Sequence, residues 1–264
     1  MPQSSQPVPD APDPAASERY RAPALDKGLD ILELLATEVS GLTRSEIVRA
    51  MGRRPSEIYR MLERLVARGY VRRSAGGDRY ALTMKLFLLG TAHPPVRRLV
   101  AQAQPLMDSF VRATLQSLHL VVNEGPVAVV VAQASQPGNW EFRLRVGAQL
   151  GMLETSSGQT LLAFQDADRR KDILAAIPAI PDHAESLSEA RLDEIRACGH
   201  RIAPSLQLVG VTDISVPVLA PDGNAFAVLT CPHVEHVGTF RNQAANVEDC
   251  LARQQELARA LRLV

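Results

Sequence analysis

Residues 25–82 contain an ordered series of short amphipathic patterns, and this order limits the folds that this part of the chain can adopt. Leucines at helical spacing predict a first helix that ends near residues 39–41. The capping-box pattern of residues 43–46 predicts the start of a short second helix. Gly52 is expected to end that helix, because glycine adopts the left-handed conformation of a helix C-terminus at low cost.

A third helix is predicted over residues 56–68, preceded by Pro55, which the first turn of a helix tolerates. Its predicted inward face is apolar and consists of Ile58, Met61, Leu62, Leu65 and Val66. Strand patterns at residues 70–73 and 79–82 flank a glycine-containing turn at residues 74–78, which predicts a hairpin. Helix, short helix, glycine turn, helix and basic hairpin together predict a winged helix-turn-helix.

Charge is distributed unevenly along the chain, although its formal net charge is zero. Residues 44–85 carry eleven basic and four acidic side chains, which leaves +7, whereas residues 1–43 carry −4 and residues 86–264 carry −3. A basic block within a neutral chain favours a polyanionic partner, although a solvated surface has the same composition. Element order and charge together predict double-stranded DNA as the partner, with the N-terminal residues of the third helix at the base edges of the major groove.

Eleven side chains of this segment are candidate DNA contacts. They are Arg44, Arg53, Arg54, Ser56, Glu57, Tyr59, Arg60, Arg64, Arg72, Arg73 and Arg79. Some have simpler explanations, since Arg60 and Arg64 also suit an ordinary charged surface and Tyr59 suits packing beneath the turn. Arg53 and Arg54 favour phosphate contacts over base readout. The arginines of the hairpin are expected along phosphates or in a minor groove.

The sequence beyond the Pro94–Pro95 pair mixes helix and strand patterns. One helical pattern covers residues 96–104, and a further helix is predicted from Pro105 onward. Strands are then predicted at residues 118–123, 128–133, 140–146, 211–219 and 224–231, and helices at residues 155–165, 168–177, 187–198 and 242–261. The predicted class is α+β. The expected parts are a disordered tail over residues 1–20, a DNA-binding domain over 21–92, linker helices over 93–116 and a second domain over 117–264.

This series of patterns resembles the IclR family of bacterial transcription regulators. The resembling segments are residues 24–32, 42–47, 55–62, 69–71, 79–82, 153–164, 195–200 and 211–223. Among them, the stretch that begins Thr155-Ser156-Ser157-Gly158 is similar to the family's Thr-Ala-x-Gly-Lys-Ala-Leu-Leu-Ala. The resemblance covers about residues 22–262 and implies a linker helix and a C-terminal effector-binding domain that is similar to GAF and PAS sensor domains. It also implies a homodimer or tetramer that controls a catabolic operon, as repressor or activator.

The start of the helix predicted over residues 155–165 gives the best local indication of ligand chemistry. Free N–H groups and a partial positive charge at a helix N-terminus suit a carboxylate, although plain N-capping requires only one hydroxyl. The resemblance implies that effectors bind at this position. Ser205–Leu208 occupies a segment that is usually acidic in the family, which favours an apolar or aromatic carboxylate. The candidate effector-binding residues are Trp140, Leu150, Met152, Thr155, Ser156, Ser157, Gly158, Leu206, Leu208, Thr212, Ile214, Ser215 and Cys231. The first three of them also suit an ordinary apolar core.

Other classes of protein find less support in the sequence. The chain has no run of 18 apolar residues, and its N-terminus lacks the features of a secretory signal. Its three distant cysteines favour a reducing cytoplasm and have no metal-ligand spacing, so we expect neither a metal nor a cofactor. It lacks a P-loop, a Gly-x-Ser-x-Gly elbow and a dinucleotide fingerprint, so we expect no enzyme. Two alternatives remain: an enzyme or ligand-binding protein that uses Cys231 and His233, and a winged helix that binds RNA or protein without an operator.

Overall fold

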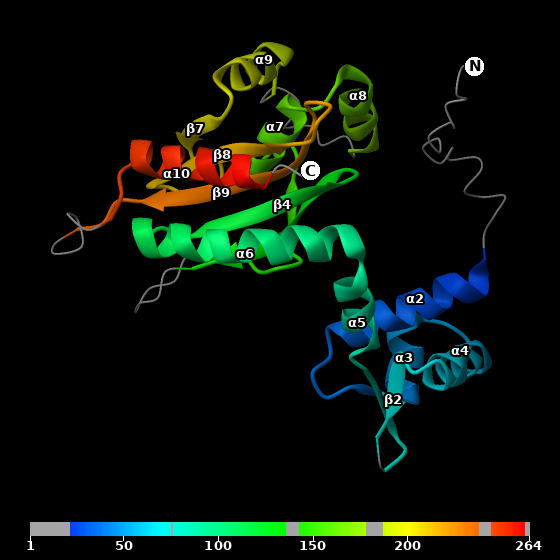
Figure 1. Cartoon of the computed structure of the whole chain (residues 1–264). Coiled ribbons are helices and arrows are strands. Elements are labelled where there is room, and N and C mark those ends of the chain that lie inside the picture. The colour runs from blue at the N-terminus through cyan, green and yellow to red at the C-terminus, as the bar shows by residue number, and fades with distance from the viewer. Residues whose placement is uncertain (1–21, 75, 136–142, 178–186, 238–243, 262–264) are drawn as a thin grey trace, which may run out of the picture. The chain divides into compact units, whose positions relative to one another are not determined.

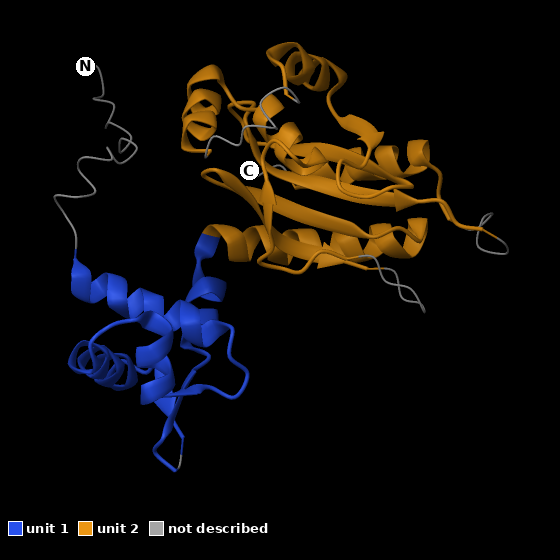
Figure 2. Cartoon of the chain, turned by 180° about the vertical axis from the view of Figure 1, so that it is seen from behind, with its two compact units in different colours: residues 1–94 blue, residues 95–264 orange. Residues whose placement is uncertain are grey.

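A computed structural model of the chain describes residues 22–74, 76–135, 143–177, 187–237 and 244–261. The chain forms two compact units, Met1–Pro94 and Pro95–Val264 (Figure 1, Figure 2). The tail expected over residues 1–20 lies outside the described residues. Within these ranges, no helix is long and apolar enough to cross a membrane.

The first unit is a winged helix-turn-helix, as the order of the sequence patterns predicted. Its helices are α2 (Pro23–Ala36), α3 (Arg44–Met51), α4 (Pro55–Ala67) and α5 (Lys85–Ala92). Its strands are β1 (Leu42–Thr43), β2 (Val71–Arg73) and β3 (Arg79–Leu82). Among the described residues these form one antiparallel sheet in the order β1-β3-β2, with the hairpin of β2 and β3 as the wing. The sequence patterns had not indicated β1 or α5.

Local capping and one small core hold this unit together. Thr43 begins α3 with a capping box, since its hydroxyl accepts from the Glu46 amide at 3.3 Å and its own amide donates to the Glu46 carboxylate at 2.7 Å. Gly41 has a φ of +65°, and a Cβ there would lie 2.4 Å from the Tyr80 carbonyl oxygen, so glycine lets β1 approach β3. The buried core consists of Ile31, Leu32, Leu35, Ile47, Ile58, Leu62, Val71 and Tyr80.

The second unit is an antiparallel sheet covered by helices. Its strands are β4 (Leu118–Glu124), β5 (Val127–Ala134), β6 (Gln149–Gly151), β7 (Arg201–Pro204), β8 (Val211–Leu219) and β9 (Ala225–Val234). Within the described ranges they lie in the order β6-β5-β4-β9-β8-β7. Its helices are α6 (Pro94–Thr114), α7 (Ser156–Ala163), α8 (Ala167–Ala176), α9 (Glu189–Cys198) and α10 (Val247–Ala260). The predicted α+β class is therefore confirmed.

Helices cover both faces of this sheet, so that it separates two apolar cores (Figure 1). On one face Met107 of α6 and Leu257 of α10 share a core with Leu229 of β9. On the other face Leu161 of α7 shares a second core with Val228, the neighbour of Leu229. Consecutive strand residues thus belong to different cores, as the alternation of side chains along a strand requires.

Three elements of this unit differ from their sequence patterns. Helix α6 continues through Pro105, because the buried face of residues 99–111 packs on the sheet and outweighs the one hydrogen bond that proline cannot make. Residues 143–146 form no strand, and the third strand of the unit is β6. The sequence patterns did not indicate β7, because it is only four residues long and follows directly on α9.

Candidate functional sites

Basic side chains are exposed on α4 and directly before it. Arg54 caps the helix in extended conformation and Pro55 opens it, which places Ser56 and Arg60 in its first two turns. The exposed side chains of Arg53, Arg54, Ser56, Arg60 and Arg64 form no hydrogen bond or ion pair in the described part of the chain. This face is therefore free to contact a ligand without breaking internal contacts.

Arg44 joins α3, α4 and the wing. Its Nε donates to the Tyr80 hydroxyl at 2.7 Å, and a terminal nitrogen donates to Glu63 Oε1 at 3.3 Å. Its guanidinium also lies over the rings of Tyr59 and Tyr80, at 5.1 and 5.6 Å from their centroids. The hydrogen bond to Tyr80 raises the pKa of Arg44. Arg44 and Tyr59 thus hold the helix-turn-helix in shape.

Three further candidate DNA contacts make internal contacts as well. Glu57 forms an ion pair with Lys27 of α2, whose Nζ donates to Glu57 Oε2 at 3.0 Å, and this hydrogen bond lowers the pKa of Glu57. Arg79 donates to the Gly41 carbonyl at 2.8 Å, and Arg73 donates to the Gly77 carbonyl within the wing. Arg72, by contrast, is exposed and has no such contact within the described ranges. The candidates thus divide into a bracing set and a free set.

A cavity in the second unit lies between the N-terminus of α7 and the sheet. Its lining residues are His119, Leu144, Leu150, Thr155, Ser156, Ser157, Ser205, Gln207, Leu208, Asp213, Thr230 and Pro232. His119 and Thr230 of this lining belong to a row across four strands, because the register pairs Thr230 with His119, Ser215 with Thr230, and Arg201 with Ser215. Asp213 lies two residues farther along β8, opposite Pro232.

Hydroxyl groups connect this row to α7. Ser157 Oγ lies 2.9 Å from Thr230 Oγ1, which in turn lies 2.8 Å from Ser215 Oγ. Thr155 caps the helix by accepting from the Gly158 amide at 3.1 Å. The amides of Ser156 and Ser157 have no acceptor among the described residues. The N-terminus of α7 therefore keeps two donors beside the cavity.

Arg201 places a cation under the same helix end. It is 5% exposed, and its Nε donates to Gln159 Oε1 at 3.1 Å while a terminal nitrogen donates to Ser156 Oγ. Burial lowers the pKa of Arg201, although the guanidinium stays charged. No acid of the described ranges forms an ion pair with it within 4 Å. The negative charge of Asp213 nevertheless acts on the guanidinium and raises the pKa of Arg201, against the larger effect of burial.

Two other ionisable groups line the cavity. His119 is 6% exposed, and burial lowers its pKa to about 4, so that the ring is neutral near pH 7. Its Nε2 lies 3.4 Å from Ser157 Oγ. Burial raises the pKa of Asp213, whose carboxylate accepts a hydrogen bond from the Ser205 hydroxyl. The lining thus includes an imidazole and a carboxylate, and the buried Arg201 hydrogen-bonds Ser156 of that lining.

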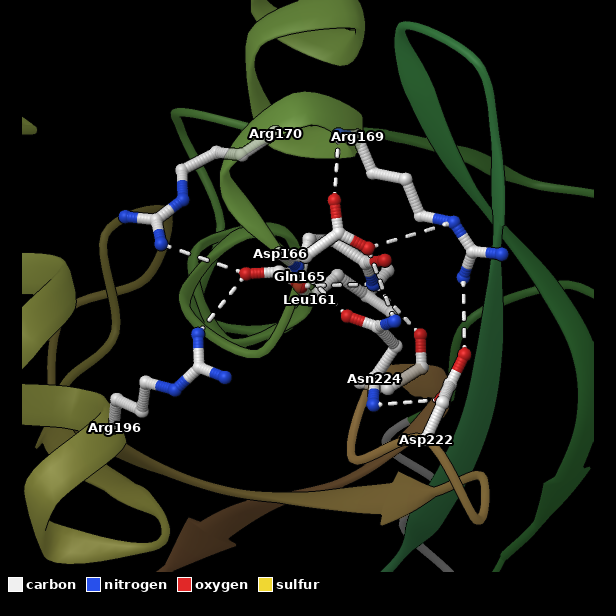
Figure 3. A network of polar contacts seen from close by, with 9 residues as sticks. Leu161, Gln165, Asp166, Arg169, Arg170, Arg196, Asp222 and Asn224 are labelled. Carbon is white, nitrogen blue, oxygen red and sulfur yellow. Dashed lines mark hydrogen bonds and ion pairs between the residues drawn. The ribbon is translucent and has the colours of Figure 1, made fainter.

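The C-terminal end of α7 is fastened to the turn between β8 and β9 (Figure 3). Asn224 accepts from the Asp166 amide at 2.7 Å and donates to the Asp166 carboxylate at 3.1 Å. Gln165 donates to the Ala225 carbonyl at 2.7 Å, and its own carbonyl accepts from Arg196 at 3.0 Å. These contacts hold the C-terminal end of α7 against the sheet, and the opposite end of the same helix borders the cavity.

The cavity contains only part of the predicted effector set. Leu150, Thr155, Ser156, Ser157 and Leu208 line it, whereas Trp140 lies outside the described residues. Met152 and Gly158 are buried directly behind the lining, Leu206 is half exposed outside it, and Ser215 lies beneath Thr230.

Three predicted effector contacts lie on the face of the sheet opposite this cavity. Ile214 and Cys231 belong to the core on the opposite face of the sheet, together with α6 and α10. Thr212 shares that face with Ile214, because side chains alternate along β8. Burial also raises the pKa of the Cys231 thiol, and His233 hydrogen-bonds the Ala245 carbonyl at 3.0 Å, so these two residues do not form an activated nucleophile.

Sequence reasoning missed His119, Arg201 and Asp213. Each is an ionisable residue in a strand segment that is otherwise apolar or hydroxyl-bearing, and this pattern is the signal that could have indicated them. These residues lie on β4, β7 and β8, far along the chain from the helix start at Thr155 that indicates ligand binding.

Two family models match most of the chain. Residues 24–75 match the IclR helix-turn-helix domain, and residues 95–254 match the bacterial transcriptional regulator IclR C-terminal domain. The chain is 27% identical to the HTH-type transcriptional regulator KdgR of Escherichia coli over 210 residues, 77% of this chain and 79% of the relative. It is 26% identical to the glycerol operon regulatory protein of Streptomyces coelicolor, over 74% of this chain and 78% of the relative.

Solved structures have the same fold. An IclR homologue of Microbacterium hydrocarbonoxydans in complex with 4-hydroxybenzoate superposes with a TM-score of 0.71 at 22% identity, covering 90% of this chain and 97% of that one. The IclR protein of Thermotoga maritima superposes with a TM-score of 0.67 at 21% identity, covering 90% and 98%. With both family models matched in order over most of its length, this chain belongs to the IclR family of bacterial transcriptional regulators, with a DNA-binding helix-turn-helix and a C-terminal effector domain.

Proposed function

We propose that α4 is the recognition helix and that its free basic face reads an operator. The observation that carries this proposal is the division of the candidate residues into two sets. Arg44, Tyr59 and Glu57 brace the helix, whereas Ser56 and Arg60 near its N-terminus are exposed and unpaired in the described chain. Recognition helices contact base edges with their N-terminal residues, so Ser56 and Arg60 face bases and Arg53, Arg54, Arg64 and Arg72 face phosphates.

The effector in this proposal is a small carboxylate with an apolar or aromatic body. The unpaired amides of Ser156 and Ser157 and the cation of Arg201 suit its carboxylate. Leu144, Leu150 and Leu208 suit an apolar body. The 4-hydroxybenzoate bound by the Microbacterium homologue is a ligand of this class.

The regulator acts in this proposal as a homodimer or tetramer in the cytoplasm, without an enzymatic step. Two recognition helices then match two half-sites of a near-palindromic operator of a catabolic operon. The effector must bind the DNA-bound and free arrangements with different affinity, because equal affinity shifts no equilibrium. A coupling of about 1–3 kcal/mol changes DNA affinity roughly 5- to 150-fold.

The DNA part is tested by fluorescence anisotropy with duplex DNA from upstream of the protein's own gene and with a scrambled duplex of equal length, at stated salt. Arg60→Ala is expected to cost about 1–3 kcal/mol on the upstream DNA and less on the scrambled DNA. Arg68→Ala, at the opposite end of the same helix, is the control and is expected to change both little. Equal losses for Arg60→Ala would make it a phosphate contact. Absence of binding at low salt, with and without acids, would refute the DNA proposal.

The effector part is tested by isothermal titration with aromatic acids, short aliphatic acids and polar sugar acids. Arg201→Met keeps much of the side-chain volume without the charge and is expected to weaken the binding of acids at least about tenfold. Arg112→Met is the control, since Arg112 is exposed on α6, which packs on the other face of the sheet. Binding of sugar acids alone would contradict the apolar class.

A further inference from the structure

Gln254 is a polar side chain buried in the apolar core between α10 and the sheet. It is 0% exposed, and its Nε2 donates to the carbonyl oxygens of Ile214 at 3.0 Å and of Leu229 at 3.4 Å. Its Oε1 is buried and has no hydrogen-bond partner in the part of the chain that the structure describes. An apolar side chain would serve packing better at this position, because a buried acceptor without a partner destabilises the fold. The amide of Gln254 therefore requires an explanation beyond packing.

The two carbonyls that bind Gln254 lie directly behind polar residues of the cavity side. Ile214 precedes Ser215 and Leu229 precedes Thr230, and the register pairs Ser215 with Thr230. Ile214 and Leu229 belong to the core shared with α10, so the side chains of Ser215 and Thr230 lie on the opposite face. The Gln254 amide thus lies across the sheet from this pair of hydroxyls.

Short polar contacts continue from the hydroxyl pair to the cavity. Thr230 Oγ1 lies 2.8 Å from Ser215 Oγ and 2.9 Å from Ser157 Oγ at the N-terminal end of α7. Thr230 and Ser157 both line the cavity. The Leu229 carbonyl and the Thr230 amide form one planar peptide unit, so a molecule that displaces Thr230 also displaces a carbonyl that binds Gln254.

On the other face of the sheet, α10 packs with α6. Leu257 of α10 shares a core with Met107 of α6, and α6 begins at Pro94, where the first unit ends. Apolar contacts are non-directional, whereas hydrogen bonds have a preferred distance and angle. The two bonds of Gln254 therefore fix the position of α10 along the strands, and a change in these bonds shifts α10 and the helix packed beside it.

We propose that Gln254 is a positioning residue that transmits occupancy of the cavity through the sheet to α10 and α6. This proposal rests on the proposed regulatory function and adds the contact through which a bound molecule alters DNA binding. The unpaired Oε1 supports it, because a polar group that is only partly satisfied holds one arrangement less firmly than a fully bonded one. Coupling between distant sites requires such an element with two arrangements.

The test compares Gln254→Met with the wild type in the full-length protein, with 4-hydroxybenzoate as the probe. Methionine has a similar length but neither the donor nor the acceptor. Fluorescence anisotropy measures DNA affinity with and without saturating probe, and isothermal titration measures probe affinity. The probe is expected to change the DNA affinity of the wild type roughly 5- to 150-fold and that of Gln254→Met less than about twofold. Gln254→Met is expected to keep its affinity for the probe, and for DNA without the probe, within about threefold of the wild type.

The control is Gln255→Met, which changes the next residue of the same helix. Gln255 is half-buried, and its side chain forms no hydrogen bond within the described ranges, so the DNA response of this variant is expected to match the wild type. Ser215→Ala removes the hydroxyl beneath Thr230 and is expected to reduce the response as well. It serves if Gln254→Met fails to fold.

Hydrogen exchange separates transmission from a general loosening of the fold. In the wild type, the probe is expected to change the exchange of amides in α7, α10 and α6, whereas in Gln254→Met only the change in α7 should remain.

The outcomes distinguish this proposal from the proposed function. An unchanged DNA response in Gln254→Met, or a probe-dependent change in α10 that persists in this variant, overturns the role of Gln254 and leaves the effector site in place. Binding of the probe by the wild type without an effect on DNA affinity also overturns it. If neither 4-hydroxybenzoate nor butanoate binds the wild type, the carboxylate effector is refuted and this proposal with it.

Discussion

Replacement of Gly158 by alanine should destabilise the second unit, although the same change within most helices stabilises the protein. An unstrained glycine-to-alanine change in a helix gains about 0.5–1 kcal/mol. At Gly158, however, the new Cβ would lie 2.5 Å from Met152 Cα and 2.6 Å from the Gly151 and Met152 carbonyl oxygens. These are backbone atoms, which cannot turn aside as a flexible side chain can. Overpacking of this kind costs about 1–3 kcal/mol or more, so we expect a net loss of about 2 kcal/mol.

The measurement is urea or thermal unfolding of the full chain, with the transition of the second unit followed separately. A loss of this size lowers the midpoint temperature by roughly 5 °C for a unit of this length. Gly90→Ala in α5 is the matched control, because no atom lies within 4 Å of its added Cβ, and it should be neutral or stabilising. If Gly158→Ala is as stable as the wild type, then α7 does not pack on residues 151–152 as described, and the position of the cavity is wrong.

Three further predictions follow from burial and hydrogen bonding. His119 binds a proton near pH 4 when folded and near pH 6.5 when unfolded, so its contribution to stability is complete above pH 6.5 and is lost as the pH falls toward 4. Urea titrations should show a loss of about 3 kcal/mol over that window, and His119→Gln should flatten the profile; an equally steep profile in the variant would disprove the assignment. Asn224→Ala should lower the free energy of unfolding by about 1–2 kcal/mol, because it removes both hydrogen bonds with Asp166. Asp168→Ala is the control. A loss below about 0.5 kcal/mol for Asn224→Ala would show that these contacts at the C-terminal end of α7 contribute little to stability. Gly41→Ala should cost more stability in the first unit than Gly69→Ala does, because both have positive φ and only Gly41 also meets a backbone oxygen; equal thermal shifts would contradict this.

The first unit was largely predictable because its signals are local. The capping box at Thr43, the left-handed Gly52 and Pro55 each mark a helix boundary within a few residues, and the structure has those boundaries. The sequence patterns did not predict helix α5, because its residues are mostly apolar without a polar face and no side chain caps its N-terminus. Pro105 predicts a helix start, but α6 continues through it because the neighbouring residues pack on the sheet.

The division of the DNA candidates into bracing and free residues required the structure. Sequence reasoning treated Arg44 and Arg60 alike, as basic residues of one segment. Their difference arises from contacts across large sequence separations, such as that of Arg44 with Tyr80, thirty-six residues away. No local pattern contains that information.

The sequence by itself determined the family, the winged helix-turn-helix, the concentration of positive charge and the helix start at Thr155, because each depends on residues close together in the chain. Only the tertiary structure decided which side chains meet in the cavity. His119, Asp213 and Thr230 line it from three different strands, and the pairing register sets which of their neighbours lie beside them and which face they share. Since a strand turns alternate side chains to opposite faces, a shift of one residue separates a cavity residue such as Asp213 from a core residue such as Ile214.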